Sequence, residues 1–270
     1  MECEACEMAA FELRADYADL DLDGRHWSEL FGGWRGSSAL GGYVCFNAGT
    51  FVVVRHVFAA IAFVAWVLQL VYRYEESASV GYYMTELQHW TVLFTFVYLA
   101  LAAFLSTVAV RGQGGLARRT PGMVLLCVAL YGAVLPLSFV NLLAYWMVIL
   151  TTYPAIHFST YVATIAPASL MLLDLWINRQ PYYAGFHALI GTATCWAYVG
   201  FTAIYWAAGG RDRAGHKYIY PQLDWSAYSS GKTVLLIILL IFPLFNVFYW
   251  FLIWARRRVL VALKPPGLSV

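Results

Sequence analysis

The chain has 270 residues, of which 61% are hydrophobic and 12% are charged, and its formal net charge is +2. So apolar a composition excludes an ordinary soluble domain. We also expect no nucleic-acid partner.

The first 47 residues are predicted to form an N-terminal extension that is acidic and rich in Gly and aromatic residues. Residues 1–30 hold nine Asp and Glu against two Arg, so this stretch carries −7 and the remainder of the chain carries +9. An acidic leader without a basic start and a short apolar run argues against a cleaved signal peptide. Insertion into a membrane is therefore expected to start from the first long apolar segment.

Six apolar stretches follow and predict an all-α integral membrane bundle, one domain covering residues 48–255. Each reaches the roughly 20 residues that a helix needs to cross the hydrocarbon core of a bilayer. The polar breaks between them are too short to be domains, and a basic tail, residues 256–270, follows the last. The predicted spans are Thr50–Tyr72, His89–Val110, Met123–Leu150, His157–Ile177, Gly185–Ala208 and Lys232–Trp254.

The distribution of Lys and Arg over the connections predicts the orientation. With six spans both termini share a side, and from residue 31 onward that side holds nine Lys and Arg near the spans, against five on the other. Cytoplasmic connections retain more of these residues, so both termini are predicted to be cytoplasmic. The sequence does not indicate which membrane is occupied.

Ionisable side chains inside the spans are the first candidates for a site. Asp174 is the only acid well inside a predicted span, and its natural partners are Arg55 and His56 in the first span. A carboxylate in lipid is expensive, so it should face the bundle and be paired. A structural polar pair is the favoured interpretation, and a proton relay or ligand site is the alternative.

Metal and cofactor chemistry has little support in the sequence. There is no HExxH, no histidine pair at a spacing of three or four, and no nearby pair of carboxylates. Cys3 and Cys6 form a lone CxxC without a second pair. We therefore predict no metal site and no cofactor, and we expect bound lipids as the ligands.

Three segments carry a family resemblance: Leu170–Trp176, Phe201–Gly210 and Lys217–Ser226. They resemble the Rolling stone-like family of eukaryotic multi-pass membrane proteins. More distantly, the chain is similar to the androgen-induced-gene-1-like membrane hydrolases through Leu135-Pro136, Tyr145-Trp146 and Tyr153-Pro154.

This resemblance implies a six-helix bundle whose hydrolytic members cleave fatty acid esters of hydroxy fatty acids with an intramembrane threonine and a histidine base. The threonine matches Thr95, whereas the histidine position, ten residues before Asp174, holds Thr164. A hydroxyl needs an adjacent base to attack an ester. His157 or His187 would have to act as the base in its place.

The favoured function is a non-catalytic, lipid-embedded component or accessory subunit of a larger membrane assembly, with membrane lipids and other membrane subunits as partners. The missing histidine and the acidic extension both favour it. The alternative is an intramembrane lipid ester hydrolase built on Thr95 with His157 or His187. A transporter using Asp174 and Arg55 is a third possibility, without the inverted repeat typical of that class.

Overall fold

The protein is described by a computed structural model that covers residues 48–77, 84–110, 121–146, 158–178, 184–211, 215–220, 223–227, 244, 247–252 and 254–255. The regular elements in these ranges are helices, as the composition predicts. The N-terminal extension 1–47 and the tail 256–270 lie outside the described residues, as does most of the sixth predicted span. The described residues of that span, Leu244, 247–252 and Trp254, are helical.

Five long helices are apolar enough to cross a membrane, so five of the six predicted spans are confirmed as membrane-length helices. Their bounds fall within a few residues of the predicted ones, apart from the extra turn at the end of α3. In the third span the α-helix ends at Ala144 and continues into a π-turn at Tyr145 and Trp146. Residues 147–150 of the predicted span lie outside the described residues. The helices are α3 (Ala48–Ser77), α5 (Leu87–Val110), α7 (Pro121–Ala144), α9 (Phe158–Ile177) and α10 (Ala184–Ala207).

Local sequence signals set two of the helix ends. Pro121 starts α7, where its fixed φ suits a helix and its missing N–H is not needed. At the end of α10, Gly209 adopts φ 76°, and the amides of Gly209 and Gly210 bond the carbonyls of Trp206 and Tyr205. This pair of bonds is a Schellman motif, which requires a left-handed residue that glycine supplies without strain.

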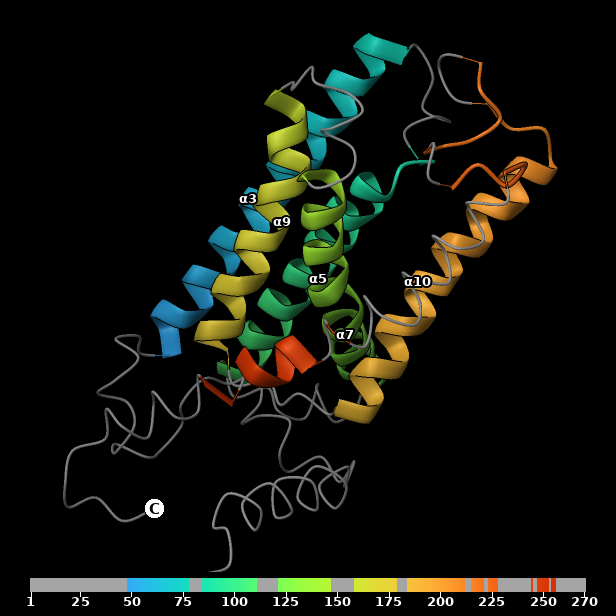
Figure 1. The fold of residues 1–270 in the computed structure, drawn as a ribbon. Helices are drawn as coiled ribbons and strands as arrows, with labels where there is room; N and C mark the ends of the chain where they lie inside the picture. Colours follow the sequence, from blue (N-terminus) through green and yellow to red (C-terminus); the bar gives the residue numbers. More distant parts are fainter. Residues whose placement is uncertain are drawn as a thin grey trace, which may run out of the picture.

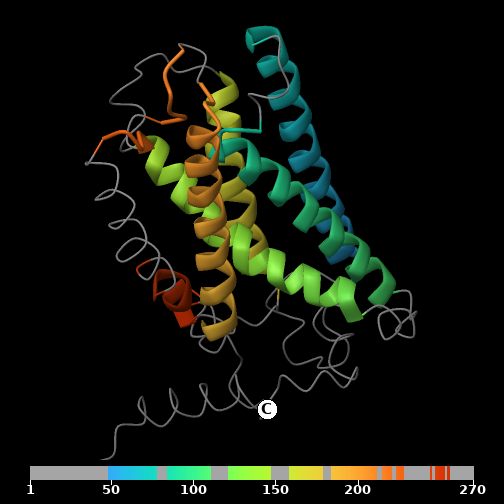
Figure 2. The same cartoon turned by 90° about the vertical axis from the view of Figure 1, so that its right-hand side faces the viewer.

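The helices alternate in direction, and α7 lies at the centre (Figure 1). It packs against α5, α9 and α10, while α3 packs against α5 and α9. A quarter turn of the view places α3 and α10 on opposite sides of the bundle (Figure 2). In keeping with this, 67% of the apolar part of α7 is buried, against 28% for α3 and for α10.

Buried polar bonds hold the antiparallel pair α3 and α9 in register at both ends. Arg55 faces Asp174 at one end, and the side-chain amide of Gln69 donates to the backbone oxygen of Ser159 at the other. These two links are about 20 Å apart along either helix. Two contacts at matching separations fix both the register and the rotation of the pair.

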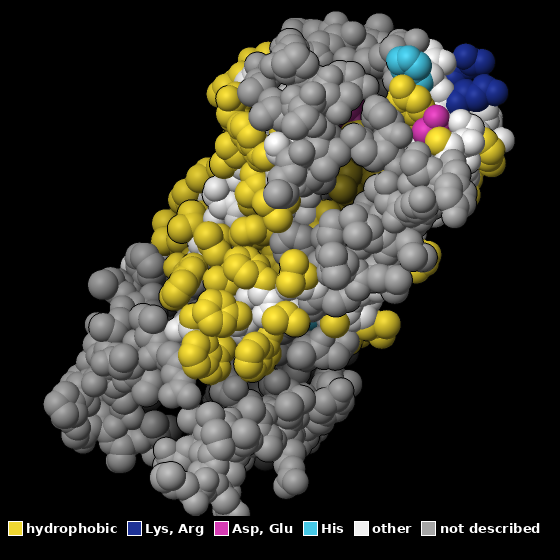
Figure 3. Space-filling view, in the orientation of Figure 1, with side chains coloured by type: hydrophobic (Ala, Val, Ile, Leu, Met, Phe, Trp, Pro, Cys, Tyr) yellow, Lys and Arg dark blue, Asp and Glu magenta, His cyan; other side chains and the backbone are white. Residues whose placement is uncertain are grey.

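Large apolar side chains gather on the face of the bundle that Figure 3 shows. On α3 they form a stripe at helical spacing, with exposed fractions of 47% to 60%, made of Val53, Val57, Ile61 and Val64. A contiguous apolar surface of this kind is an aggregation hazard in water. A bilayer provides matching acyl chains, so this is an integral, multi-pass membrane protein.

Candidate functional site

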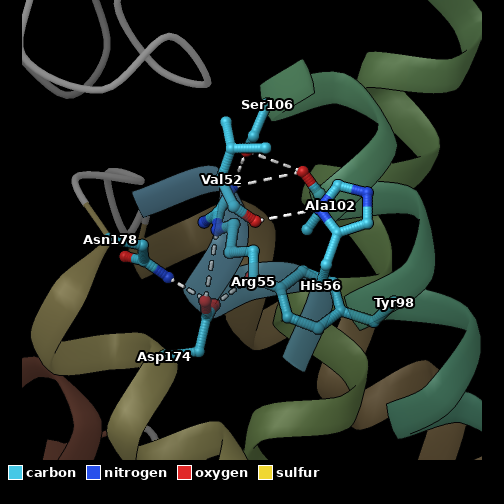
Figure 4. A network of polar contacts seen from close by, with 8 residues as sticks. All are labelled: Val52, Arg55, His56, Tyr98, Ala102, Ser106, Asp174 and Asn178. Atoms are coloured by element: carbon cyan, nitrogen blue, oxygen red, sulfur yellow. Dashed lines mark hydrogen bonds and ion pairs between the residues drawn. The ribbon is translucent and has the colours of Figure 1, made fainter. Parts of the chain in front are cut away.

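The candidate site is a polar network that joins α3, α5 and α9 (Figure 4). At its centre, Nε of Arg55 lies 3.4 Å from Oδ1 of Asp174, and both side chains are 0% exposed. The two residues come from helices that are distant in sequence and adjacent in space. The structure thus brings together one of the two residue pairs that the sequence suggests.

Asp174 receives two hydrogen bonds on its second oxygen. The hydroxyl of Tyr98 on α5 donates to Oδ2 over 2.6 Å, and Nδ2 of Asn178 donates to the same atom over 2.7 Å. Asn178 follows Asp174 by four residues, so the end of α9 places it directly beside the carboxylate. The carboxylate is therefore stabilised by neutral donors as well as by Arg55.

Arg55 is held by α5 through its other guanidinium nitrogen. Nη1 donates to Oγ of Ser106 over 2.7 Å and lies 3.4 Å from the backbone oxygen of Ala102. The Ser106 hydroxyl donates its own proton to that Ala102 oxygen. The guanidinium carbon also lies 4.6 Å from the centre of the Phe51 ring, a cation–π contact.

The network is buried and electrically balanced. Its charged and hydroxyl side chains are 0% exposed, and Asn178 is 3% exposed. One positive and one negative charge cancel, which limits the cost of burying either in a medium of low dielectric constant. Chemically, such an arrangement is suited to tying three helices together, and it offers a substrate no open face among the described residues.

The network lies near one end of the bundle. Asp174 precedes the end of α9 at Ile177 by about 5 Å, and Arg55 follows the start of α3 by about 10 Å. Ser106 is likewise close to the end of its span. The charges are therefore one to two helical turns from the helix ends at this end of the bundle.

His56 lies outside the network, contrary to the suggestion that it pairs with Asp174. Its ring is exposed on α3, and Nδ1 lies 2.8 Å from the backbone oxygen of Val52 in the same helix. Neighbouring residues of a helix point about 100° apart. Because Arg55 faces the bundle, His56 must face away from it.

The threonines of the hydrolase hypothesis bond their own helices. Thr95 is 1% exposed, and its hydroxyl donates its proton to the backbone oxygen of Thr91 over 2.7 Å. Thr164, which takes the place of the family histidine, donates to Thr160 in the same way over 2.8 Å. This back-bonding is the ordinary behaviour of a hydroxyl in an apolar helix.

The two candidate bases are placed differently. His157 lies outside the described residues. His187, on α10, is 0% exposed and packs edge-on against Tyr131 of α7, with ring centres 5.9 Å apart. A Cβ at Gly132 would come within 2.6 Å of Cδ2 of this histidine, so glycine is what allows α7 and α10 to approach here. His187 thus belongs to the packing between these two helices.

Among the described residues, no three His, Cys, Asp or Glu side chains lie close enough to hold a metal ion. Cys3 and Cys6, the CxxC pair of the extension, lie outside those ranges.

Two buried polar links are not predicted by the sequence. Gln69 bonds Ser159, and Asn141 of α7 bonds the backbone oxygen of Ala163 in α9. For each link the sequence offers one amide side chain within an apolar span. For the second link it also offers Pro167, which follows the acceptor residue Ala163 by four positions. A lone amide of this kind shows that a partner is needed but does not identify it.

A second polar region caps the opposite end of the bundle. The backbone N–H of Leu87, the first residue of α5, donates to the hydroxyl of Tyr220 over 3.1 Å, and the Trp225 indole donates to Thr202 over 3.2 Å. Beside it, the rings of Trp90, Tyr198 and Phe201 pack together. The segment around 217–226, one of those that carry the family resemblance, thus binds the ends of α5 and α10.

Asp224 in this cap lies outside the spans and forms a tight turn with Ser226. The hydroxyl and the backbone N–H of Ser226 both donate to Oδ1 of Asp224, over 2.6 and 3.0 Å. These two bonds favour the ionised carboxylate and lower its pKa below the ordinary value.

Comparison of the chain with known protein families, with curated proteins and with solved structures finds no match in any of the three.

Proposed function

We propose that the protein, which resembles the Rolling stone-like family, is a non-catalytic, lipid-embedded component of a larger membrane assembly. Its partners are other membrane subunits, and lipids bind along its apolar outer surface.

The observation that carries this proposal is the burial of the candidate site. Arg55 and Asp174 are fully buried and face each other, and their neighbours Tyr98 and Ser106 bond them directly. A catalytic or transport site needs a group that a substrate can reach. The network instead has the geometry of a link between helices.

The placement of Thr95 supports the same conclusion. A nucleophilic hydroxyl must give its proton to a base within about 3 Å, directly or through one water. The Thr95 proton is directed to the Thr91 carbonyl instead. Carbonyl oxygens accept hydrogen bonds but do not remove protons at neutral pH.

We also propose that the chain crosses the membrane six times, with both termini cytoplasmic. The Tyr249 hydroxyl donates to the backbone oxygen of Leu135 in α7 over 2.7 Å, and the rings of Phe248 and Tyr249 pack on Phe139. Ala227, by contrast, belongs to the cap at the far end of α10. The intervening 20 or so residues are enough for one helical crossing of about 30 Å.

One preparation tests the central proposal. The full-length protein is purified from its native membrane in mild detergent, and its mass in solution and its co-migrating proteins and lipids are determined. We expect a defined complex with other membrane proteins. A particle that contains a single copy of this chain and no other protein contradicts the proposal.

The same preparation is assayed with fatty acid esters of hydroxy fatty acids, and Thr95→Ala is compared with Thr107→Ala. Thr107 is the matched control because its hydroxyl also donates to its own helix, at Ala103. We expect no turnover by any of the three proteins. Turnover that is abolished by Thr95→Ala and retained by Thr107→Ala identifies a hydrolase and overturns the non-catalytic assignment.

A further inference from the structure

Pro167 interrupts the hydrogen bonding of α9 close to its middle. Proline has no backbone N–H, so the carbonyl four residues earlier loses its partner within the helix. That carbonyl belongs to Ala163, which is 0% exposed. In a membrane no water replaces the missing donor, and an unsatisfied carbonyl is therefore costly.

Asn141 of α7 supplies the donor. Its Nδ2 lies 3.1 Å from the backbone oxygen of Ala163, and the Asn141 side chain is only 5% exposed. This is the one carbonyl in α9 that Pro167 leaves without its helical partner. The carbonyl that Pro167 frees is therefore the carbonyl that the Asn141 amide binds.

The position of this bond divides α9 into two arms. The first arm is tied to α3 through Ser159, which accepts from Gln69. The second arm is tied to α3 and α5 through Asp174. Asp174 follows Pro167 by seven residues, two helical turns, so both lie on the same side of the helix. The Asn141 bond lies between the two arms.

We propose that Pro167 is a hinge in α9 and that Asn141 is the latch that holds it. With the latch closed, α9 is held against α7 beside Pro167, and the second arm keeps Asp174 beside Arg55. With the latch open, the two arms move independently, and the second arm leaves the ion pair. Proline is among the few causes of a sharp bend in a helix, and the bend needs an outside donor to be held at one angle.

A double-mutant cycle tests the latch directly. Asn141→Leu removes the donor, whereas Pro167→Ala restores the backbone N–H that bonds Ala163 within α9. We expect Asn141→Leu to lower the Tm of the full-length protein in detergent by several degrees. In the Pro167→Ala background the same substitution should lower Tm by less than half as much. An equal loss in both backgrounds overturns the proposal.

Ser138→Ala is the matched control in α7. Ser138 is buried and polar like Asn141, but its hydroxyl bonds Leu135 in its own helix. Hydrogen exchange measured by mass spectrometry then locates the effect. In Asn141→Leu we expect faster exchange in residues 164–178 and no change in α5, and in Ser138→Ala no change in either. Faster exchange spread evenly over all helices contradicts a hinge.

The wild-type protein provides a measurement that does not depend on the folding of any variant. In a bilayer sample labelled with ¹⁵N at asparagine and ¹³C at the alanine carbonyl, solid-state NMR should show a close contact between Nδ2 of Asn141 and the Ala163 carbonyl. Absence of that contact, with both signals resolved, rules the latch out.

Discussion

Arg55 carries a full positive charge at a position that water does not reach. Three different kinds of group stabilise it: the Asp174 carboxylate, the Ser106 hydroxyl with the Ala102 carbonyl, and the face of the Phe51 ring. Asp174 in turn has two neutral donors of its own. The two charges are therefore supported separately as well as by each other.

This arrangement predicts strong coupling between the two residues. Arg55→Met leaves a buried carboxylate without its counter-charge and should cost about 3–5 kcal/mol of stability. Adding Asp174→Asn removes that charge while keeping an oxygen for Tyr98 and Asn178, so the double variant should be more stable than Arg55→Met alone. Unfolding in a detergent titration measures each variant.

His56→Ala is the control for this series. His56 is exposed and bonds only its own helix, so we expect a change within about 0.5 kcal/mol. Strictly additive losses for Arg55→Met and Asp174→Asn would contradict the ion pair.

Asp224 gives the cap a defined response to pH. Its pKa in the folded protein is lowered by the hydroxyl and the N–H of Ser226, so the ionised form stabilises the turn. This contribution is present at neutral pH and is lost as the pH falls below about 4, the ordinary pKa of the group, through its lowered value.

NMR titration of the Asp224 carboxyl carbon should therefore give a pKa below that of an unperturbed aspartate. Ser226→Ala removes the hydroxyl donor and should move the pKa upward, toward the ordinary value. An unchanged titration in Ser226→Ala means that the side-chain bond has no influence on the carboxylate.

The sequence identifies which residues need partners better than it identifies the partners. A single acid and a single arginine inside apolar spans suggest each other, and the structure places them 3.4 Å apart. Tyr98 could not be selected in the same way, because the chain has 19 tyrosines and most of them suit a membrane interface. Asn141 was missed because its partner is a backbone carbonyl, which has no sequence signature except Pro167.

At the scale of the helices, hydropathy alone locates the elements. The predicted span His157–Ile177 differs from α9 by one residue, and Gly185–Ala208 differs from α10 by one residue at each end. The faces that pack together are harder to predict, because a helix that is apolar all round shows no stripe. For this reason the sequence does not distinguish Arg55 from its neighbour His56 as the partner of Asp174.

The outer stripe of α3 predicts how the helix tolerates charge. Ile61 and Val71 are similarly exposed, at 47% and 49%, but Ile61 is at the middle of the span and Val71 is next to its end at Tyr72. Lysine at a helix centre costs roughly 3 kcal/mol on insertion, whereas near an end it reaches the interface. Ile61→Lys should therefore reduce insertion in a glycosylation assay, and Val71→Lys should not.

Ile61→Leu serves as the control and should insert like the wild type. Equal effects of the two lysine substitutions would show that α3 does not cross the membrane with Ile61 near its centre.

At the scale of the whole molecule, the alternation of five helices assigns each described end to one of two sides (Figures 1 and 2). Thr50 and Gly122 lie in the first turns of α3 and α7, at one end of the bundle. Met84 precedes α5, and Arg211 follows α10, at the other end. All four are exposed, so each can report the side of the membrane on which it lies.

Single cysteines at these four positions should fall into two groups when sealed vesicles are treated with a membrane-impermeant thiol reagent. Thr50→Cys and Gly122→Cys should share one accessibility, and Met84→Cys and Arg211→Cys the opposite one. In the parent protein Cys3, Cys6 and Cys45 are replaced by serine so that they do not react with the reagent. Cys127 and Cys195 can stay, because both are buried. Any mixed pairing contradicts the up-and-down arrangement.

The position of the ion pair near one end of the bundle also bears on how the chain is made. Ribosomes add about 5–20 residues per second, so Asp174 is synthesised on the order of ten seconds after Arg55, roughly 120 residues earlier in the chain. During that delay α3 leaves the translocon with an uncompensated guanidinium. From a site within two turns of the helix end, this long side chain can extend to the lipid phosphates until α9 arrives. Biosynthesis therefore favours a terminal location for Arg55 over a central one.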